Sequence, residues 1–261
     1  MEIYATVLDG NGEPMRGLDR SQFALHENGA VKRIRSFETL ERAPFSIGLA
    51  VDSSSSMNDV MPDVHRTART FLSRALADGS SAFLIDFDEA PRLAAARTTD
   101  IPTLDAAIGE IRADRSTALY DSIIFGLLQL QGIHGKRALI VLTDGRDETS
   151  RYSLEDAVAV ARESSVAIYA IILAPRPRPE DAKLDPQIEK IAVETGGRAW
   201  YLPESANMDA IYRAIDLELR NQYRLTYRTT PGKGASDWRA VKVTVDQPGA
   251  SVRTAAGFVA R

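Results

Sequence analysis

From Pro44 to about Arg220, short apolar runs alternate with segments of helix length. Alternation of this kind predicts an α/β fold with a doubly wound, mostly parallel sheet and helices on both of its faces. The expected strands lie at 45–52, 81–87, 136–145, 166–174 and 199–202, and the expected helices at 62–76, 101–111, 119–131, 154–163, 185–195 and 205–220. Ser153 directly precedes one of these helices and is expected to cap it. The proline-rich run at 175–179 is expected to form an exposed turn.

The two ends of the chain have a different, β-like pattern. Short β-like runs lie at 2–8, 22–27 and 32–37, and three more follow residue 221. Because about three strands are at the margin of independent stability, we expect both ends to join in one small antiparallel β-sandwich. The predicted division is therefore 1–43 and 222–261 for the two parts of the sandwich, with an α/β domain at 44–221 inserted between them.

The composition excludes several classes of function. The formal net charge of −4 gives no reason to expect nucleic-acid binding. The chain has no cysteine, which excludes disulfides, zinc–thiolate sites and cysteine nucleophiles. No stretch approaches the roughly 20 apolar residues of a membrane span, so direct membrane insertion is not expected.

The first expected strand ends in a way that burial does not explain. Its apolar run stops at Asp52, which is followed by four serines. Asp52, Ser54 and Ser56 are spaced so that three oxygen-bearing side chains can converge beyond the strand end, where open α/β sheets bind ligands. Such hard oxygen ligands, without a nearby His or Cys, suit Mg²⁺, Mn²⁺ or Ca²⁺ rather than zinc.

Two other stretches place oxygen ligands where they can join this loop. Thr117 lies in RSTALYD, just before an expected helix, and Asp144 in LTDGRD, directly after an expected strand. If the two strands are neighbours, Asp52 and Asp144 lie at the same edge of the sheet. Two carboxylates balance a divalent cation, and the remaining hydroxyl ligands are neutral. A metal held in this way stays electrophilic and can accept a carboxylate from outside.

In this order the pieces DxSxS, Thr before ALYD, and TDG resemble the von Willebrand factor type A domain over about residues 44–221. In that family they form the metal-ion-dependent adhesion site. The resemblance implies that Asp52, Ser54, Ser56 and Thr117 bind the metal directly or through water, and that Asp144 acts mostly through a bound water. It also implies a cell-adhesion or protein-interaction module whose partner presents Asp or Glu. Many members have Gly where this chain has Ser55, which is mildly unfavourable if the position needs a positive φ.

The flanks are similar to those of bacterial, exported proteins that contain this domain, particularly ATVLDGNGEP near the start and WRAVKVTVDQPGASVRTAAGFVA at the end. The first residues lack a signal-peptide pattern. We therefore expect a periplasmic or cell-surface protein whose signal peptide is missing from this chain, with a cytoplasmic location as the alternative.

Several acidic residues allow alternative interpretations, and so does the function. Asp121 fits either an acceptor behind the metal ligands, which orients the metal loops, or a charge at a helix start. Asp147 and Glu148 are expected to lie in a solvated loop. Asp86 and Asp88 in LIDFDEA resemble the DxD of haloacid-dehalogenase-type phosphatases, but lysines are absent from Arg33 through Gly135, so no enzymatic activity is expected. The remaining alternative is a structural scaffold with no ligand.

Overall fold

The computed structural model describes residues 1–41, 43–114, 116–173, 187–202, 207–232 and 237–260. It confirms the predicted fold class: a six-stranded, mostly parallel sheet flanked by helices, joined to two antiparallel sheets from the chain ends. The proline-rich turn expected at 175–179 lies outside the described residues.

The central sheet has the strand order β10-β9-β8-β5-β6-β7. Strands β5 and β8 lie at its centre and pair in parallel, with Val51 opposite Leu142. Every residue of β5 is buried, as expected for a strand covered on both faces. The six strands are β5 Phe45–Asp52, β6 Ser81–Phe87, β7 Pro91–Thr98, β8 Lys136–Thr143, β9 Ala167–Ile172 and β10 Arg198–Tyr201.

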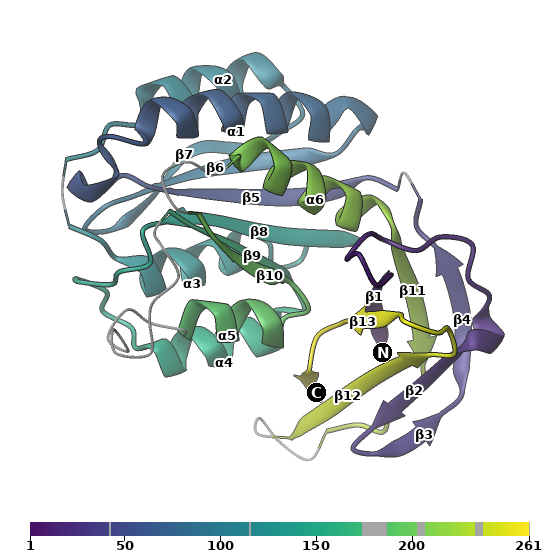
Figure 1. Cartoon of the computed structure of the whole chain (residues 1–261). Coiled ribbons are helices and arrows are strands. Elements are labelled where there is room, and N and C mark those ends of the chain that lie inside the picture. The colour runs from purple at the N-terminus through teal and green to yellow at the C-terminus, as the bar shows by residue number, and fades with distance from the viewer. Residues whose placement is uncertain (42, 115, 174–186, 203–206, 233–236, 261) are drawn as a thin grey trace.

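Helices cover both faces of this sheet (Figure 1). Helices α1, α2 and α6 pack on one face and α3, α4 and α5 on the other, and each set encloses its own apolar cluster. Ser153 caps α4 as predicted, since its hydroxyl accepts from the Asp156 N–H at 3.2 Å. The helices are α1 Met61–Ala75, α2 Ile101–Glu110, α3 Leu119–Gln129, α4 Leu154–Ser164, α5 Gln187–Glu194 and α6 Met208–Arg220.

One strand of the central sheet is missing from the sequence prediction. Strand β7 pairs antiparallel with β6 at the sheet edge. Its sequence PRLAAART begins with proline and is rich in alanine, and most of its residues are at least partly exposed. An edge strand pairs on one side only, so such a sequence is tolerated there although Thr98 is its only β-branched residue.

The chain ends form a small sandwich of two sheets, ordered β13-β1-β11-β4 and β14-β12-β2-β3. The N-terminal strand β1 pairs with β11, and β2 pairs with β12, so each sheet combines both ends of the chain. The run expected as one strand at 32–37 is instead split between β3 and β4, which belong to different sheets. The strands are β1 Glu2–Leu8, β2 Phe23–Glu27, β3 Ala30–Lys32, β4 Ile34–Thr39, β11 Gln222–Tyr227, β12 Trp238–Val245, β13 Ser251–Arg253 and β14 Gly257–Val259.

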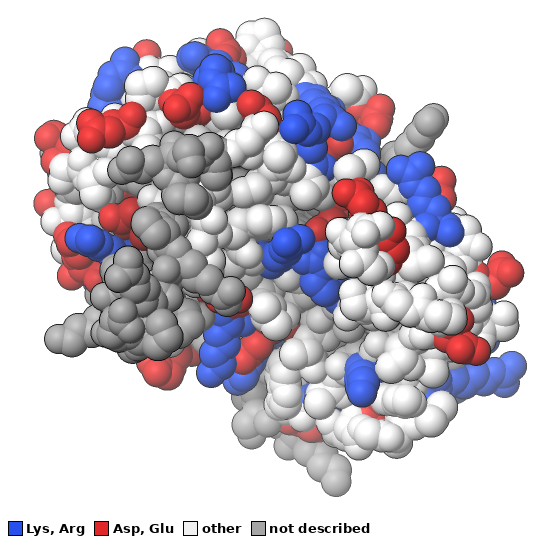
Figure 2. All heavy atoms as spheres, viewed as in Figure 1, with Lys and Arg blue, Asp and Glu red and all other residues white. Residues whose placement is uncertain are grey.

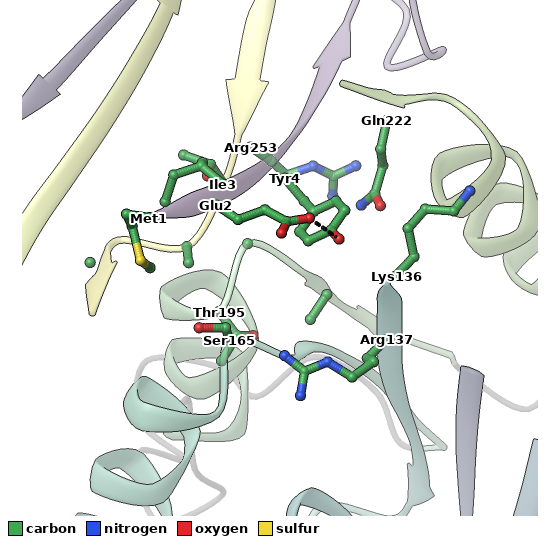
Figure 3. Close-up of a pocket in the computed structure, with 15 residues that line it drawn as sticks. Met1, Glu2, Ile3, Tyr4, Lys136, Arg137, Ser165, Thr195, Gln222 and Arg253 are labelled. Carbon is green, nitrogen blue, oxygen red and sulfur yellow. Dashed lines mark hydrogen bonds between the residues drawn. The ribbon is translucent and has the colours of Figure 1, made fainter. Parts of the chain in front are cut away.

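The sandwich lies against the end of the central sheet where β5 and β8 begin (Figure 1). The buried ammonium of Lys136 donates to the carbonyls of Leu40 at 3.1 Å and Leu219 at 2.8 Å, and so holds both chain connections between the two units. Burial, with Arg220 nearby, lowers the pKa of Lys136 to about 8. A small cavity separates the units here, with Glu2 and Tyr4 of β1 on one side and Arg137 of β8 on the other (Figure 3).

Basic and acidic side chains are interspersed over the face shown in Figure 2. This distribution agrees with the net charge of −4. Within the described ranges, no helix is both long and apolar enough to cross a membrane.

Candidate metal centre

Asp52 is the last residue of β5 and Asp144 directly follows the neighbouring strand β8, at the end of the sheet farthest from the sandwich (Figure 1). Because β5 and β8 run in parallel, their last residues, Asp52 and Thr143, lie side by side, and Asp144 is the next residue after Thr143. The Thr143 hydroxyl donates to Oδ2 of Asp52 at 2.7 Å. The two carboxylates are close enough for Asp144 to contribute to the raised pKa of Asp52. The structure therefore brings the two predicted acidic ligands together.

The four serines at 53–56 form a loop, here called the serine loop, that turns back on Asp52. The N–H of Ser54 donates to Oδ1 of Asp52 at 2.9 Å, and the hydroxyls of Ser54 and Ser56 lie 3.0 Å apart. Ser54 is buried and Ser56 is exposed, so the loop runs from the interior to the surface. Three predicted ligands thus lie in one turn of chain.

Ser55 does not strain this loop. It opens the short 3-10 helix Ser55–Met57, and the described non-glycine residues with positive φ are Asn28 and Ser165. The position usually held by Gly therefore does not require a left-handed conformation in this chain. Met57, which is only 1% exposed, anchors the end of the turn in the core.

Asp86 and Arg92 support the serine loop from the neighbouring strands. Oδ1 of Asp86 accepts from the Ser53 hydroxyl at 2.5 Å, and the Ser53 N–H donates to the Phe87 carbonyl at 2.8 Å. Arg92 of β7 forms ion pairs with both Asp86 and Asp88. These contacts hold the two aspartates of LIDFDEA in a structural network. This role was not predicted from the sequence, because Arg92 lies on β7, a strand that has no clear sequence signal.

Thr117 is buried and is held by its backbone neighbours. Its carbonyl accepts from the N–H groups of Glu148 at 2.8 Å and Thr149 at 3.0 Å. The next N–H, that of Ala118, donates to the Asp88 carbonyl at 2.7 Å. Thr117 therefore lies where the loop after β8 meets the turn after β6, at the same sheet edge as Asp52.

Asp121 and Asp147 join α3 to the loop after β8. Oδ1 of Asp121 accepts from the N–H groups of Arg151 at 2.9 Å and Tyr152 at 3.0 Å. Asp147 lies in this loop as expected, but it is half-buried and accepts from the N–H of Leu119 at 2.8 Å, so its carboxylate is only partly solvated. Glu148 is exposed, as expected. This contact was not predicted, because Asp147 caps the start of α3, a helix from another segment of the chain.

The electrostatics favour a bound cation. Asp52 is fully buried, and this burial, partly offset by its hydrogen bonds, raises its pKa to about 6. Asp144 pairs with Arg146, whose Nε lies 3.8 Å from Oδ2 and whose side chain is largely exposed. Among the described residues no group of three His, Cys, Asp or Glu converges. Two carboxylates with serine and threonine hydroxyls fit a hard divalent ion.

Replacing Asp86 by Ala is expected to lower the free energy of unfolding by about 1–3 kcal/mol, because charge-assisted hydrogen bonds to Ser53 and Arg92 are lost in a buried position. Urea denaturation in EDTA measures this effect. The control Asp105→Ala breaks an exposed pair with Arg69 and should cost at most about 1 kcal/mol. Equal effects of the two substitutions would show that Asp86 does not support the loop.

Comparison with known proteins places these features in a family. The model of the von Willebrand factor type A domain matches residues 46–214. No curated protein sequence matches the chain. The fold is similar to a von Willebrand factor type A structure from Catenulispora acidiphila, at 15% identity and a TM-score of 0.59, over 99% of this chain and 63% of that one.

Two further solved structures are similar over the central domain. BatB from Bacteroides thetaiotaomicron matches at 18% identity and a TM-score of 0.51, over 67% of this chain and 97% of that one. The PilB minor pilin from Streptococcus sanguinis matches at 15% identity and a TM-score of 0.51, over 67% of this chain and 62% of that one. At these identities the similarity concerns the fold.

Proposed function

Because the chain belongs to the von Willebrand factor type A family, we propose that it is a protein-binding module that depends on a divalent cation. The metal, Mg²⁺ or alternatively Mn²⁺ or Ca²⁺, binds at the outer edge of the central sheet. There it captures an Asp or Glu side chain of a partner protein, in adhesion or in another interaction.

The observation that carries this proposal is the buried carboxylate of Asp52 beside Asp144 and the paired hydroxyls of Ser54 and Ser56. A buried carboxylate with a raised pKa gains stability from a cation placed against it. Asp52, Ser54, Ser56 and Thr117 would hold the ion directly or through water, and Asp144 mostly through water. The ion would supply an electrophilic position for an outside carboxylate. Asp121 would act only indirectly, since its described hydrogen bonds go to Arg151 and Tyr152.

The same site argues for binding rather than catalysis. The two aspartates that resemble a phosphatase motif, Asp86 and Asp88, are both paired with Arg92. We therefore propose a non-enzymatic module with an inserted domain at 44–221 and a sandwich from 1–43 and 222–261. The metal edge faces away from the sandwich (Figure 1).

We also propose that the protein is exported. The flanks resemble those of exported bacterial proteins, and the absence of cysteine is compatible with export. The fold is shared with a minor pilin and with an aerotolerance-related membrane protein from Bacteroides fragilis, which matches at 22% identity and a TM-score of 0.52 over 67% of this chain and 98% of that one.

Selective retention of partner proteins tests the proposed function. Proteins from a bacterial lysate should be retained on the immobilised chain in Mg²⁺, released by EDTA and not retained by the Asp52→Ala variant. Blocking the lysate carboxylates by amidation should abolish retention even in Mg²⁺. Retention that persists in EDTA would assign binding to another surface, and retention of amidated proteins would contradict acidic-residue capture.

A further inference from the structure

We propose that Asp147 is a positioning residue of the metal site, which fixes Thr117 relative to Asp144 by joining the two loops that carry them. This inference rests on the proposed metal site and adds a residue outside its ligand set. Thr117 and Asp144 come from separate segments, before α3 and after β8. A metal site tolerates ligand displacements of only about 0.2 Å, so something must hold the segments in register.

The carboxylate of Asp147 supplies a missing cap to α3. The residue at the N-cap position of this helix is Ala118, which has no side-chain acceptor. Oδ1 of Asp147 instead accepts from the N–H groups of Leu119 at 2.8 Å and Tyr120 at 3.2 Å. A carboxylate at this place satisfies free N–H groups and interacts favourably with the helix dipole. The start of α3, two residues after Thr117, is thereby tied to the other loop.

The loop after β8 is tied to the α3 segment in return. The N–H groups of Glu148 and Thr149 both donate to the carbonyl of Thr117 itself. Ser150 donates from its hydroxyl to Oδ1 of Asp147 at 2.5 Å and accepts from the Asp121 N–H at 3.1 Å. The segment that carries Thr117 is therefore hydrogen-bonded directly to the loop that begins at Asp144.

The predicted ligands differ in how they are positioned relative to one another. Ser54 and Ser56 share one turn with Asp52, so their relative positions are set locally. Thr117 has no such local connection to Asp144, because 26 residues separate them in the sequence, and contacts between the two loops hold their segments together. Loss of Asp147 should therefore affect metal binding chiefly through Thr117.

Mn²⁺ titrations of single and double variants test this inference. Asp147→Ala is expected to raise the Kd for Mn²⁺ about 10- to 100-fold, as for other residues that orient metal ligands. In a Thr117→Ala background, the same substitution should add less than about 2-fold, because the ligand it positions is already gone. The matched control is Asp156→Ala, which removes a helix-capping carboxylate of α4 next to the same loop and should leave the Kd within about 2-fold.

The titrations distinguish failure of the inference about Asp147 from failure of the proposed metal site. An unchanged Kd in Asp147→Ala, with weakened binding in Thr117→Ala, would overturn the inference and leave the metal site intact. The full effect of Asp147→Ala persisting in the Thr117→Ala background would also overturn it. Unchanged Mn²⁺ binding in both Asp52→Ala and Thr117→Ala would instead overturn the proposed function. If Asp147→Ala does not fold, Asp147→Asn in the same cycle should weaken binding by about 3-fold, and no change would contradict the inference.

Discussion

Replacing Asp52 by Asn is expected to stabilise the metal-free protein at pH 7 while it removes divalent-cation binding. Burial raises the pKa of Asp52 from 3.8 to about 6, so ionisation of this group opposes folding. A shift of this size corresponds to about 3 kcal/mol, of which we expect about 2 kcal/mol to be recovered by a neutral amide. Asn keeps one oxygen acceptor for the Ser54 N–H, so the loop retains that contact.

The pH dependence follows from the same shift. A carboxyl group whose pKa is raised by folding stabilises the folded state below its unfolded pKa. This stabilisation is lost as the pH rises through the folded value. For wild-type protein in EDTA, the contribution of Asp52 to stability should therefore fall between about pH 4 and pH 6. The Asn variant should lack this fall. With metal, the stability of the wild-type protein should instead increase with pH up to about pH 6. Below that pH, protons compete with the cation and weaken its binding.

Urea denaturation from pH 4 to pH 7, with EDTA and with saturating Mg²⁺, measures both effects. Wild-type protein should gain about 2.7 kcal/mol at a Mg²⁺ concentration 100 times the Kd, and the Asn variant should gain none. The control Asp100→Asn changes an exposed helix cap and should leave the Mg²⁺ effect intact. A metal-free Asn variant that is less stable than wild type at pH 7 would show that burial of the Asp52 carboxylate does not destabilise the folded protein.

Replacing Arg253 by Ala is expected to lower the free energy of unfolding by about 3 kcal/mol, because it leaves a buried carboxylate without its cation. Arg253 of β13 pairs with Glu218 near the end of α6, and Glu218 is only 2% exposed. Burial raises the pKa of Glu218, whereas Arg253 acts in the opposite direction. Arg253 lines the cavity between the sandwich and the central domain, so this pair connects the two units (Figure 3).

A double-mutant cycle in urea separates the ion pair from general damage. Glu218→Gln combined with Arg253→Ala should recover most of the lost stability, since the buried charge is gone. The penalty of Arg253→Ala alone should also shrink from pH 7 to pH 5, because the unpaired Glu218 binds a proton. The control Arg66→Ala breaks exposed pairs with Asp63 and Asp209 and should have a far smaller effect. A similar loss in the two Arg variants would contradict the connecting role of the pair.

Much of the fold could be predicted because its strands and helices have strong local patterns. The fully buried strand β5 and the apolar stripe of α6 were both predicted from sequence, although the first residues expected for α6 lie outside the described range. Strand β7 was missed because its alanine-rich sequence lacks strand character and its place at the edge is set by pairing with β6. The split between β3 and β4 was missed because the chain changes sheets within an otherwise continuous β-like run.

For the candidate site, the residues near strand ends could be predicted and their supports could not. Asp52 and Asp144 follow strand ends, and the parallel pairing of β5 and β8 brings them together. The partners that hold the loops, Asp86 and Asp147, act on residues more than 25 positions away in the sequence. No local pattern identifies such contacts, because they depend on which loops meet in the folded chain. The metal-ligand roles remain predictions.

Direct titration of Mn²⁺ into the metal-free protein tests the central claim most directly, with isothermal calorimetry as the readout and Mg²⁺ as competitor. We predict that wild-type protein binds a single ion per chain, that Mg²⁺ displaces it, and that Asp52→Ala weakens binding by more than about 100-fold. Asp100→Ala should bind as wild type does. Absence of binding to wild-type protein, or equal affinity in Asp52→Ala, would contradict a metal site at this edge of the sheet.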